Sequence, residues 1–178
     1  MVAAKAYASG IPVWCAHDAI VDVASLVPNP GNPNKHPQFQ IDLGAKIIKA
    51  NGWRWPICIS KRSGFITKGH GRLLFALALG ASEVPVDYQD YEDEAAEWRD
   101  VLADNRLPEF ADIDLELVKD ILESVDALDA DLTGYDPDEL FKELDGSPND
   151  AEFKEYDESV EDEVEFITCP ECGHKWPK

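Results

Sequence analysis

A glycine-rich stretch with three basic side chains is the part of this sequence best suited to chemistry. Residues 65–76 read FITKGHGRLLFA, so an apolar run leads into Gly69 and Gly71 and then into a segment with helical spacing. Glycine at a strand-to-helix junction lets the chain turn tightly, and the first turn of a helix has free N–H groups that favour an anion. Lys68, His70 and Arg72 add cationic or protonatable groups at the same point. The pattern predicts a phosphate site.

This stretch differs from the two common phosphate-binding loops. A Walker loop has a longer spacing between its glycines, and the dinucleotide fingerprint needs a third glycine. A tight turn surrounded by solvated charges is therefore the alternative to a phosphate site. His70 also has two interpretations, because a histidine in a loop can be a neutral hydrogen-bonding partner or a general acid and base.

The elements around this stretch predict a small α+β domain over residues 13–110. Strands are expected at 13–16, 57–60, 65–67 and 84–88, helices at 38–51, 71–79 and 90–104, and a loop rich in proline and asparagine at 28–34. Pro37 suits the start of the first helix, and Asn51-Gly52 suits its end. Pro85 lacks an N–H group, so the strand at 84–88 is expected near an edge of the sheet.

Composition limits the class of protein. The chain has 178 residues, 44% of them hydrophobic, which is enough for one domain and an appendage. No apolar run approaches the length of a membrane span and no signal pattern opens the chain, so a cytoplasmic location is expected. Four dispersed cysteines fit a reduced compartment.

The net charge of −20 is distributed unevenly along the chain. Residues 1–80 hold nine Lys and Arg against three Asp and Glu, whereas residues 81–165 hold five against thirty-two. The predicted phosphate site therefore lies in the basic part. The acidic part would repel nucleic acid unless a counter-charged partner or a metal neutralises it.

Three motifs in order carry a resemblance to a known family. They are GWRWPI at 52–57, GHGR at 69–72 and DNR at 104–106, with L-x-P-x-P at 26–30 upstream and LGxxxVPV at 79–86 between the second and third. Together they resemble the ParB/sulfiredoxin-like domain, and most of all the short ParB-like nuclease-type domains of phages and mobile elements. The resemblance covers residues 20–110 and depends on the combination of motifs.

The resemblance implies a bound nucleoside triphosphate, CTP or ATP, with magnesium. In that family the first motif lies against base and sugar, the second cradles the phosphates, and the third approaches the triphosphate and its metal. The implied nucleotide-binding residues are Gly52, Trp55, Pro56, Lys68, Gly69, His70, Gly71, Arg72, Asn105 and Arg106. Asp104 and Asn105 are the implied metal ligands, and their oxygens are the hard ligands that magnesium prefers.

Three departures from the family patterns narrow the implied function. His70-Gly71 replace the Glu-Arg of ParB, and sulfiredoxin has its catalytic cysteine where this chain has His70. The helix-turn-helix domain of partitioning ParB proteins is replaced by short acidic helices. Sulfinic-acid reduction and clamp formation on a centromere are therefore not expected.

Three functions follow for comparison. The first is a nucleotide-binding protein in the DNA transactions of a phage or mobile element, with DNA or a DNA-processing protein such as a methyltransferase as partner and a homodimer as its possible assembly. The second is a metal-dependent enzyme on the same fold (an NTP hydrolase, a nuclease or a small-molecule kinase), with His70, Arg72 and Asp104 as catalytic residues. The third is an acidic DNA mimic or adaptor.

The rest of the chain is expected to form an acidic helical extension at 111–145, an acidic linker at 146–165 and a tail at 166–178. The tail contains Cys169-Pro170-Glu171-Cys172-Gly173, the turn of a zinc knuckle, followed by His174. Cys169, Cys172 and His174 supply three of the four ligands of a closed zinc site. The alternative is a tail without metal.

Overall fold

The computed structural model describes residues 3–125, 129–145, 166–168 and 175–177. The chain groups into two compact units, Met1–Phe141 and Lys142–Lys178. Helix α5 (Pro137–Asp145) crosses the boundary. Within the second unit, β7 (Phe166–Thr168) pairs antiparallel with β8 (Lys175–Pro177). No described helix has the length and apolar character needed to cross a membrane.

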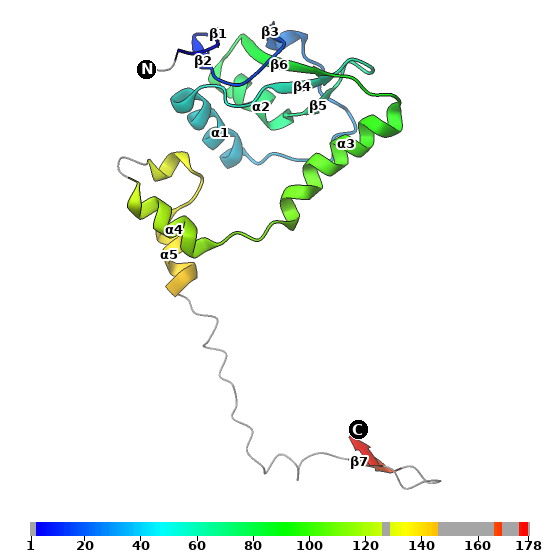
Figure 1. Ribbon diagram of the computed structural model, residues 1–178, viewed down its shortest axis with the longest axis vertical. Helices are drawn as coiled ribbons and strands as arrows, with labels where there is room; N and C mark the ends of the chain where they lie inside the picture. The colour runs from blue at the N-terminus through cyan, green and yellow to red at the C-terminus, as the bar shows by residue number, and fades with distance from the viewer. Residues whose placement is uncertain (1–2, 126–128, 146–165, 169–174, 178) are drawn as a thin grey trace. The chain divides into compact units, whose positions relative to one another are not determined.

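A four-stranded sheet forms the centre of the first unit (Figure 1). Its strands in spatial order are β3 (Ala19–Asp22), β6 (Glu83–Gln89), β4 (Ile57–Ser60) and β5 (Ile66–Lys68). β4 runs parallel to β6, and the other two neighbouring pairs are antiparallel. A short hairpin precedes the sheet and consists of β1 (Ala6–Ala8) and β2 (Ile11–Val13).

Helix α2 (His70–Leu79) packs on this sheet, where it contacts β4, and α1 (Gln38–Asn51) packs on α2. Gly44 permits the close approach of the two helices, since a Cβ there would lie 2.4 Å from Phe75 Cε2. The buried core contains Ile48, Trp53, Ile57, Ile59, Ile66, Leu73, Ala76, Val84 and Val86.

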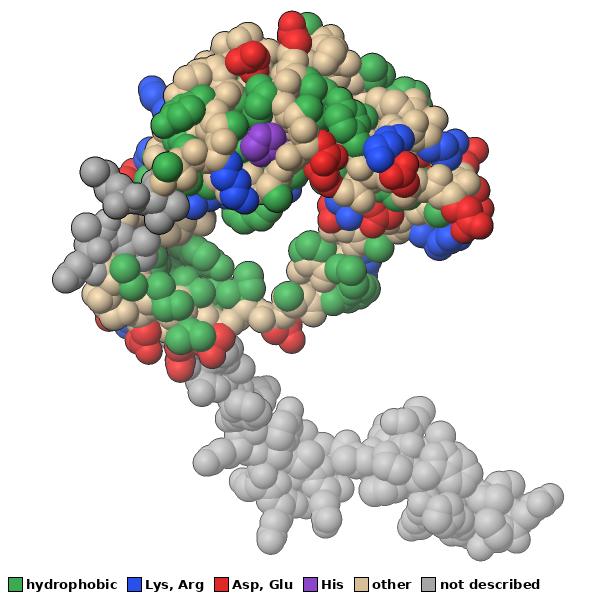
Figure 2. Space-filling model, turned by 45° about the horizontal axis from the view of Figure 1, so that its top comes forward, with side chains coloured by type: hydrophobic (Ala, Val, Ile, Leu, Met, Phe, Trp, Pro, Cys, Tyr) green, Lys and Arg blue, Asp and Glu red, His purple; other side chains and the backbone are tan. Residues whose placement is uncertain are grey.

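α3 (Glu94–Arg106) contacts β5 at the far end of the sheet. A 3-10 turn, η2 (Leu107–Phe110), continues it, and α4 (Leu115–Ser124) and η3 (Ala130–Leu132) follow. Figure 2 shows hydrophobic side chains on the surface along the end of α3 and over the segment with α4. The exposed ones are Leu102, Leu107, Phe110, Ile113, Leu117, Ile121 and Val125.

The α+β class and most expected elements are confirmed. The helix at 38–51 has the predicted bounds, and Gly52 ends it with φ +72°. The first strand ends at Val13 instead of starting there, because β1 and β2 pair as a hairpin. α3 begins at Glu94 and not at Asp90, because the carboxylate of Asp93 accepts a hydrogen bond from the Ala96 N–H and caps the helix.

The expectation that the strand at 84–88 lies near an edge is wrong, since β6 is between β3 and β4. Pro85 is opposite Ile20 of β3, and β4 pairs with β6 only from Val86 onward. The Val23 N–H bonds the Ser82 carbonyl, and hydrogen-bonded pairs alternate along an antiparallel ladder. The missing N–H of Pro85 therefore falls where neither neighbouring strand needs a donor.

Candidate functional site

The turn from β5 into α2 has the geometry of an anion site. Gly69 precedes α2 with φ +93°, in the left-handed region that glycine adopts readily. The Leu73 N–H is the first in α2 to bond back, to the Gly69 carbonyl at 3.1 Å. The N–H groups of the first turn, on His70, Gly71 and Arg72, therefore have no partner within the helix. They and the positive end of the helix dipole favour a negative ligand.

Arg72 is a half-buried cation beside this turn. Its Nη1 donates to the Pro56 carbonyl at 2.6 Å, and no described carboxylate forms an ion pair with it. Burial lowers the pKa of the Arg72 guanidinium, and the nearby Cys58 and Asp104 act in the opposite direction. A buried charge is costly without a counter-charge, so an anion would be stabilised here.

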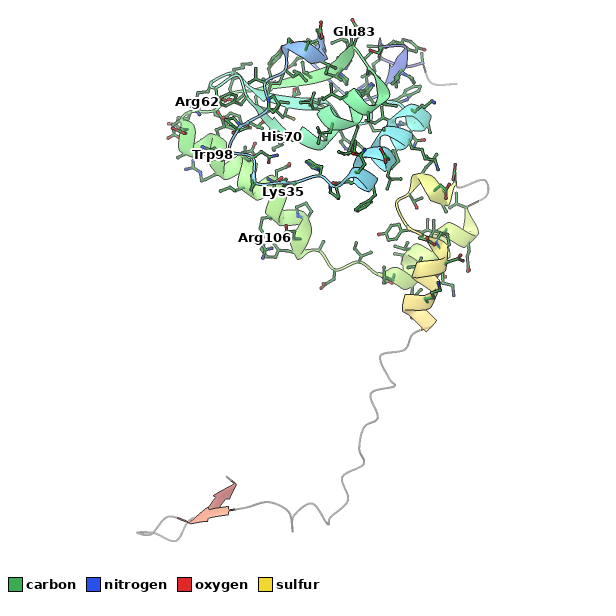
Figure 3. The ribbon with its side chains drawn as sticks, turned by 180° about the vertical axis from the view of Figure 1, so that it is seen from behind. Lys35, Arg62, His70, Glu83, Trp98 and Arg106 are labelled. Atoms are coloured by element: carbon green, nitrogen blue, oxygen red, sulfur yellow. The ribbon has the colours of Figure 1, made fainter. Side chains whose placement is uncertain are left out.

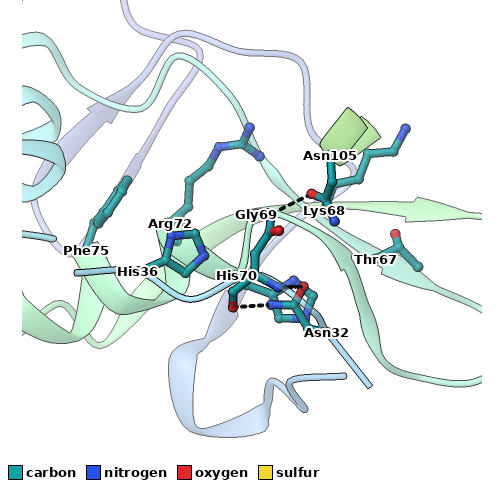
Figure 4. Close-up of a pocket in the computed structure, with 11 residues that line it drawn as sticks. Asn32, His36, Thr67, Lys68, Gly69, His70, Arg72, Phe75 and Asn105 are labelled. Carbon is teal, nitrogen blue, oxygen red and sulfur yellow. Dashed lines mark hydrogen bonds between the residues drawn. The ribbon is translucent and has the colours of Figure 1, made fainter. Parts of the chain in front are cut away.

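Two neighbouring cavities meet at Arg72 and Phe75. The first holds about 190 Å³ and is shown in Figure 4. It is lined by Asn32, Asn34, His36, Thr67, Lys68, Gly69, His70, Gly71, Arg72, Phe75 and Asn105. The second holds about 680 Å³ and is lined by Gly44, Ile47, Ile48, Asn51, Gly52, Trp53, Arg54, Trp55, Arg72, Phe75, Leu132 and Thr133. The first is polar, and the second is mostly apolar.

The structure brings most of the predicted nucleotide-binding residues to these two cavities. The whole second motif and Asn105 line the first cavity, and Gly52 and Trp55 line the second. Pro56 contributes its carbonyl, which holds Arg72. Of the two tryptophans in the first motif, Trp53 is a core residue, while the side chain of Trp55 is exposed.

Lys68 is held by two carboxylates of α3. Its Nζ lies 3.0 Å from Asp100 Oδ1 and 3.8 Å from Asp104 Oδ1. Burial acts to lower the pKa of Lys68, but the bond to Asp100 and the charges of Asp100 and Asp104 together outweigh this, so the pKa is raised. Tyr91 donates to Asp100 at 2.6 Å, and its own burial and this bond raise the pKa of Tyr91 to about 12. The lysine is therefore a neutralised part of the cavity wall.

The third motif forms the last turn of α3, and of its three residues Asn105 lines the first cavity. The Oδ1 of Asn105 accepts a hydrogen bond from Asn34 Nδ2 at 2.8 Å. Arg106 lines neither cavity; it pairs with Glu109, and its guanidinium lies 4.3 Å from the Phe110 ring centre (Figure 3).

Among the described residues, no group of three or more His, Cys, Asp or Glu side chains could hold a metal. The predicted zinc ligands Cys169, Cys172 and His174 lie outside the described residues.

His70 positions the loop at 29–36 above the turn. Its Nε2 accepts a hydrogen bond from the Asn29 N–H at 3.2 Å, so that nitrogen has no proton in this arrangement. Asn29 is buried, and its Oδ1 accepts the Gly31 N–H at 2.9 Å. Gly31 lies against Trp98 of α3, where a Cβ would be 2.6 Å from the indole. Figure 3 shows His70 and Trp98, on α2 and α3, beside this loop.

We expect the stability of the fold to fall as the pH drops below the ordinary histidine pKa of about 6.5. Burial lowers the pKa of His70, and the nearby His36 adds to this effect. Its stabilising contribution is therefore complete above pH ~6.5 and is lost as the pH falls toward the lowered folded pKa. A loss on the order of 1 kcal/mol is expected, the usual value of one hydrogen bond.

Urea unfolding measured between about pH 8 and pH 5 tests this expectation. The His70→Gln variant should lose the part of the slope near pH ~6, because an amide does not titrate there. His17→Gln is the matched control, since among the described residues His17 bonds only the Cys15 carbonyl and it lines neither cavity. A slope that His70→Gln leaves intact would contradict the assignment.

Five residues of the first cavity were not predicted from the sequence. Three come from the loop and two from the helix and strand beneath it: Asn32, Asn34, His36, Thr67 and Phe75. The one available signal was the three asparagines between the prolines at 28–37. Such residues also form ordinary turns, so composition did not distinguish a binding loop from a connecting one.

No family model and no curated protein matches this chain. Among solved structures, it is similar to the C-terminally truncated chromosome-partitioning protein ParB from Caulobacter crescentus complexed with CTP-γ-S. The identity is 18% and the TM-score 0.54, over 68% of this chain and 73% of that chain. The same truncated ParB complexed to the centromeric parS site matches at 17% identity and a TM-score of 0.42, over 71% and 70% of the two chains.

A Pnob8-like ParB-N domain also matches, at 17% identity and a TM-score of 0.40, over 89% of this chain and 56% of that chain. The first of the three similarities defines the fold. The chain has a ParB-like α+β fold, and the expectation drawn from its three motifs is confirmed at that level.

Proposed function

We propose that this protein binds a nucleoside triphosphate, with the phosphates at the β5–α2 turn and the nucleoside toward Trp55. The observation that carries the proposal is Arg72, a half-buried cation that pairs with no described carboxylate and lines both cavities. A guanidinium group at the junction of a polar and an apolar cavity suits a ligand with one anionic and one aromatic end.

The backbone around Arg72 leaves space for phosphate oxygens. A Cβ on Gly69 would lie 2.8 Å from Arg72 Nη1, and a Cβ on Gly71 would lie 3.1 Å from His36 Cε1. Any side chain at either position would therefore crowd the groups that face the cavity. The free N–H groups of the first α2 turn then contact the anion directly.

The second cavity suits a base and sugar. Its volume of about 680 Å³ falls within the ~300–1,000 Å³ common for small-molecule sites. Phe75 and Trp55 offer aromatic surfaces, and base stacking on such rings contributes about 1–3 kcal/mol per base. CTP and ATP both fit this chemistry, and the CTP-γ-S complex of a chain with the same fold supports CTP.

Magnesium would arrive with the triphosphate and supply charge neutralisation. Asp104 is the residue that fits it best, because its carboxylate is partly exposed and its contact with Lys68, at 3.8 Å, is longer than the 3.0 Å contact of Asp100. Asn105 Oδ1 accepts one hydrogen bond, from Asn34, which leaves its second lone pair for a cation. Magnesium commonly takes only one or two protein carboxylates and keeps several waters.

The cellular role that we infer is in DNA transactions of a phage or mobile element. The ParB-like fold, which a chromosome-partitioning protein shares, supports this role. DNA or a DNA-processing protein such as a methyltransferase would be the partner, and homodimer formation would accompany it. In this proposal His70 holds the loop at 29–36 in place and does not transfer protons, because its Nε2 accepts a hydrogen bond from the Asn29 N–H.

Calorimetric titration with CTP, ATP and GTP in magnesium tests the proposal. Arg72→Ala should weaken binding by about 10- to 100-fold, since hydrogen bonds to charged groups contribute about 1.5–3 kcal/mol. Arg99→Ala is the matched control, because Arg99 is exposed on α3 and lines neither cavity. Thermal unfolding should show that both variants are folded. Absence of saturable binding to all three nucleotides would reject the proposal, as would binding unaffected by Arg72→Ala.

A further inference from the structure

His36 lies at the end of the loop that covers the first cavity. It precedes Pro37, the residue at the start of α1, and its ring packs over the first turn of α2 beside Gly71. Figure 4 shows the ring near Arg72 and His70, and all three side chains line the cavity. His36 therefore faces the position at which the α2 N–H groups would hold a phosphate.

The hydrogen bond that His36 makes determines which of its ring nitrogens is available to a ligand. Nδ1 lies 3.0 Å from Gln40 Oε1, and an amide oxygen can only accept, so Nδ1 carries the proton. Nε2 has no hydrogen-bond partner within the described part of the chain. In the neutral ring Nε2 presents a lone pair, which repels a phosphate oxygen, whereas in the protonated ring it presents an N–H that binds one.

The charges around His36 also favour an anion beside it. From α2 it faces His70 and the cation Arg72, and from α1 its neighbour is the neutral Gln40. Lys68 of β5 shares the cavity, but Asp100 and Asp104 of α3 neutralise it. None of the residues that line this cavity is Asp or Glu. Of its two histidines, His70 is engaged at Nε2 by the Asn29 N–H, so His36 is the one free to gain a proton toward the ligand.

We propose that His36 is a phosphate-binding residue, which strengthens nucleotide binding when its ring is protonated and Nε2 donates to a phosphate oxygen. This inference rests on the proposed function of the same cavity. The proton goes onto Nε2 from solvent, and the resulting N–H donates to a phosphate oxygen while Nδ1 keeps its bond to Gln40. Binding and proton uptake are then linked, so a bound triphosphate favours the protonated ring.

The test compares wild type with His36→Gln, using inorganic tripolyphosphate as one probe and CTP and ATP with magnesium as the others. At about pH 6 the variant should bind all three about tenfold more weakly, the usual effect of one charged hydrogen bond, and the ratio should shrink to about twofold near pH 8. The phosphates of the probe also titrate near pH ~6, but this is common to both proteins and cancels in the ratio.

His17→Gln serves as the matched control and should bind as wild type does at every pH. The inference is overturned if His36→Gln binds like wild type at about pH 6, or if the loss is the same at all pH values. Either result would leave the proposed function standing, provided that Arg72→Ala still weakens binding. If wild type binds none of the probes, both proposals are rejected together.

Discussion

Replacing Gly52 by alanine is expected to lower the free energy of unfolding by about 4 kcal/mol. Gly52 ends α1 with φ +72° and ψ −177°, a combination that residues with a Cβ almost never adopt. A Cβ there would also lie 2.5 Å from the Pro12 carbonyl oxygen and 2.7 Å from Trp14 Nε1. The carbonyl cannot move freely, because it accepts the Trp53 N–H at 2.8 Å.

Gly64→Ala is the control, because it measures the cost of a positive φ without the steric overlap that a Cβ on Gly52 would make. Gly64 has nearly the same φ, +75°, but no atom lies within 4 Å of a Cβ placed there. Its replacement should cost only about 1 kcal/mol, the usual penalty for a left-handed conformation. Urea denaturation of both variants gives the comparison. Equal losses in the two variants would show that the contact with Pro12 does not constrain Gly52.

The elements that local chemistry determines were predicted well from the sequence. α1 has both of its expected ends, because Pro37 starts a helix and Asn51-Gly52 stops one through residues next to each other in the chain. The turn before α2 was recognised for the same reason, since Gly69 and Gly71 adjoin the helix that they begin. Arg72, the residue that carries the proposed function, belongs to that local pattern.

The features that depend on distant contacts were missed. Pro85 suggested an edge strand, but whether a missing N–H matters depends on which strand lies beside it and where that strand begins. The loop residues Asn34 and His36 become part of the first cavity only when the loop folds over α2 and α3. The assignment of Arg106 to the nucleotide stays a prediction, since this residue lines neither cavity and pairs with Glu109 one turn along the chain.

Replacing Glu97 by alanine is the second change expected to have a large effect, with a loss of about 3 kcal/mol in unfolding free energy. Glu97 is only 3% exposed and attaches α3 to the β4–β5 turn. Ser60 donates to its Oε2 at 2.6 Å, Ser63 donates to its Oε1 at 2.7 Å, and Arg62 Nε lies 3.0 Å from Oε2. The Ser60 hydroxyl oxygen also accepts hydrogen bonds from the N–H groups of Arg62 and Ser63. Its own proton is donated to Glu97, so Glu97→Ala would leave that proton without an acceptor.

Glu94→Ala is the control on the same helix. Glu94 is exposed in the first turn of α3, where its charge favours the helix dipole by about 0.3–1 kcal/mol. Thermal or urea unfolding should therefore separate the two variants by at least about 2 kcal/mol. A difference below that value would mean that α3 is held by its apolar contacts, with Val101 as its buried residue.

Acid unfolding gives an independent measure of the same cluster. Burial acts to raise the pKa of Glu97, but the bonds from Ser60 and Ser63 and the charge of Arg62 outweigh it, so the pKa is lowered. The stability that the ionised carboxylate contributes is then complete above the ordinary glutamate pKa of about 4.3 and is lost as the pH falls through the lowered folded value. Glu97→Gln does not titrate, so it should lose less stability than wild type over that interval. Since α3 carries Asn105 to the first cavity and holds Lys68 of the cavity wall through Asp100 and Asp104, the same variant should also weaken nucleotide binding at neutral pH. Retained affinity would show that α3 keeps its place without the carboxylate.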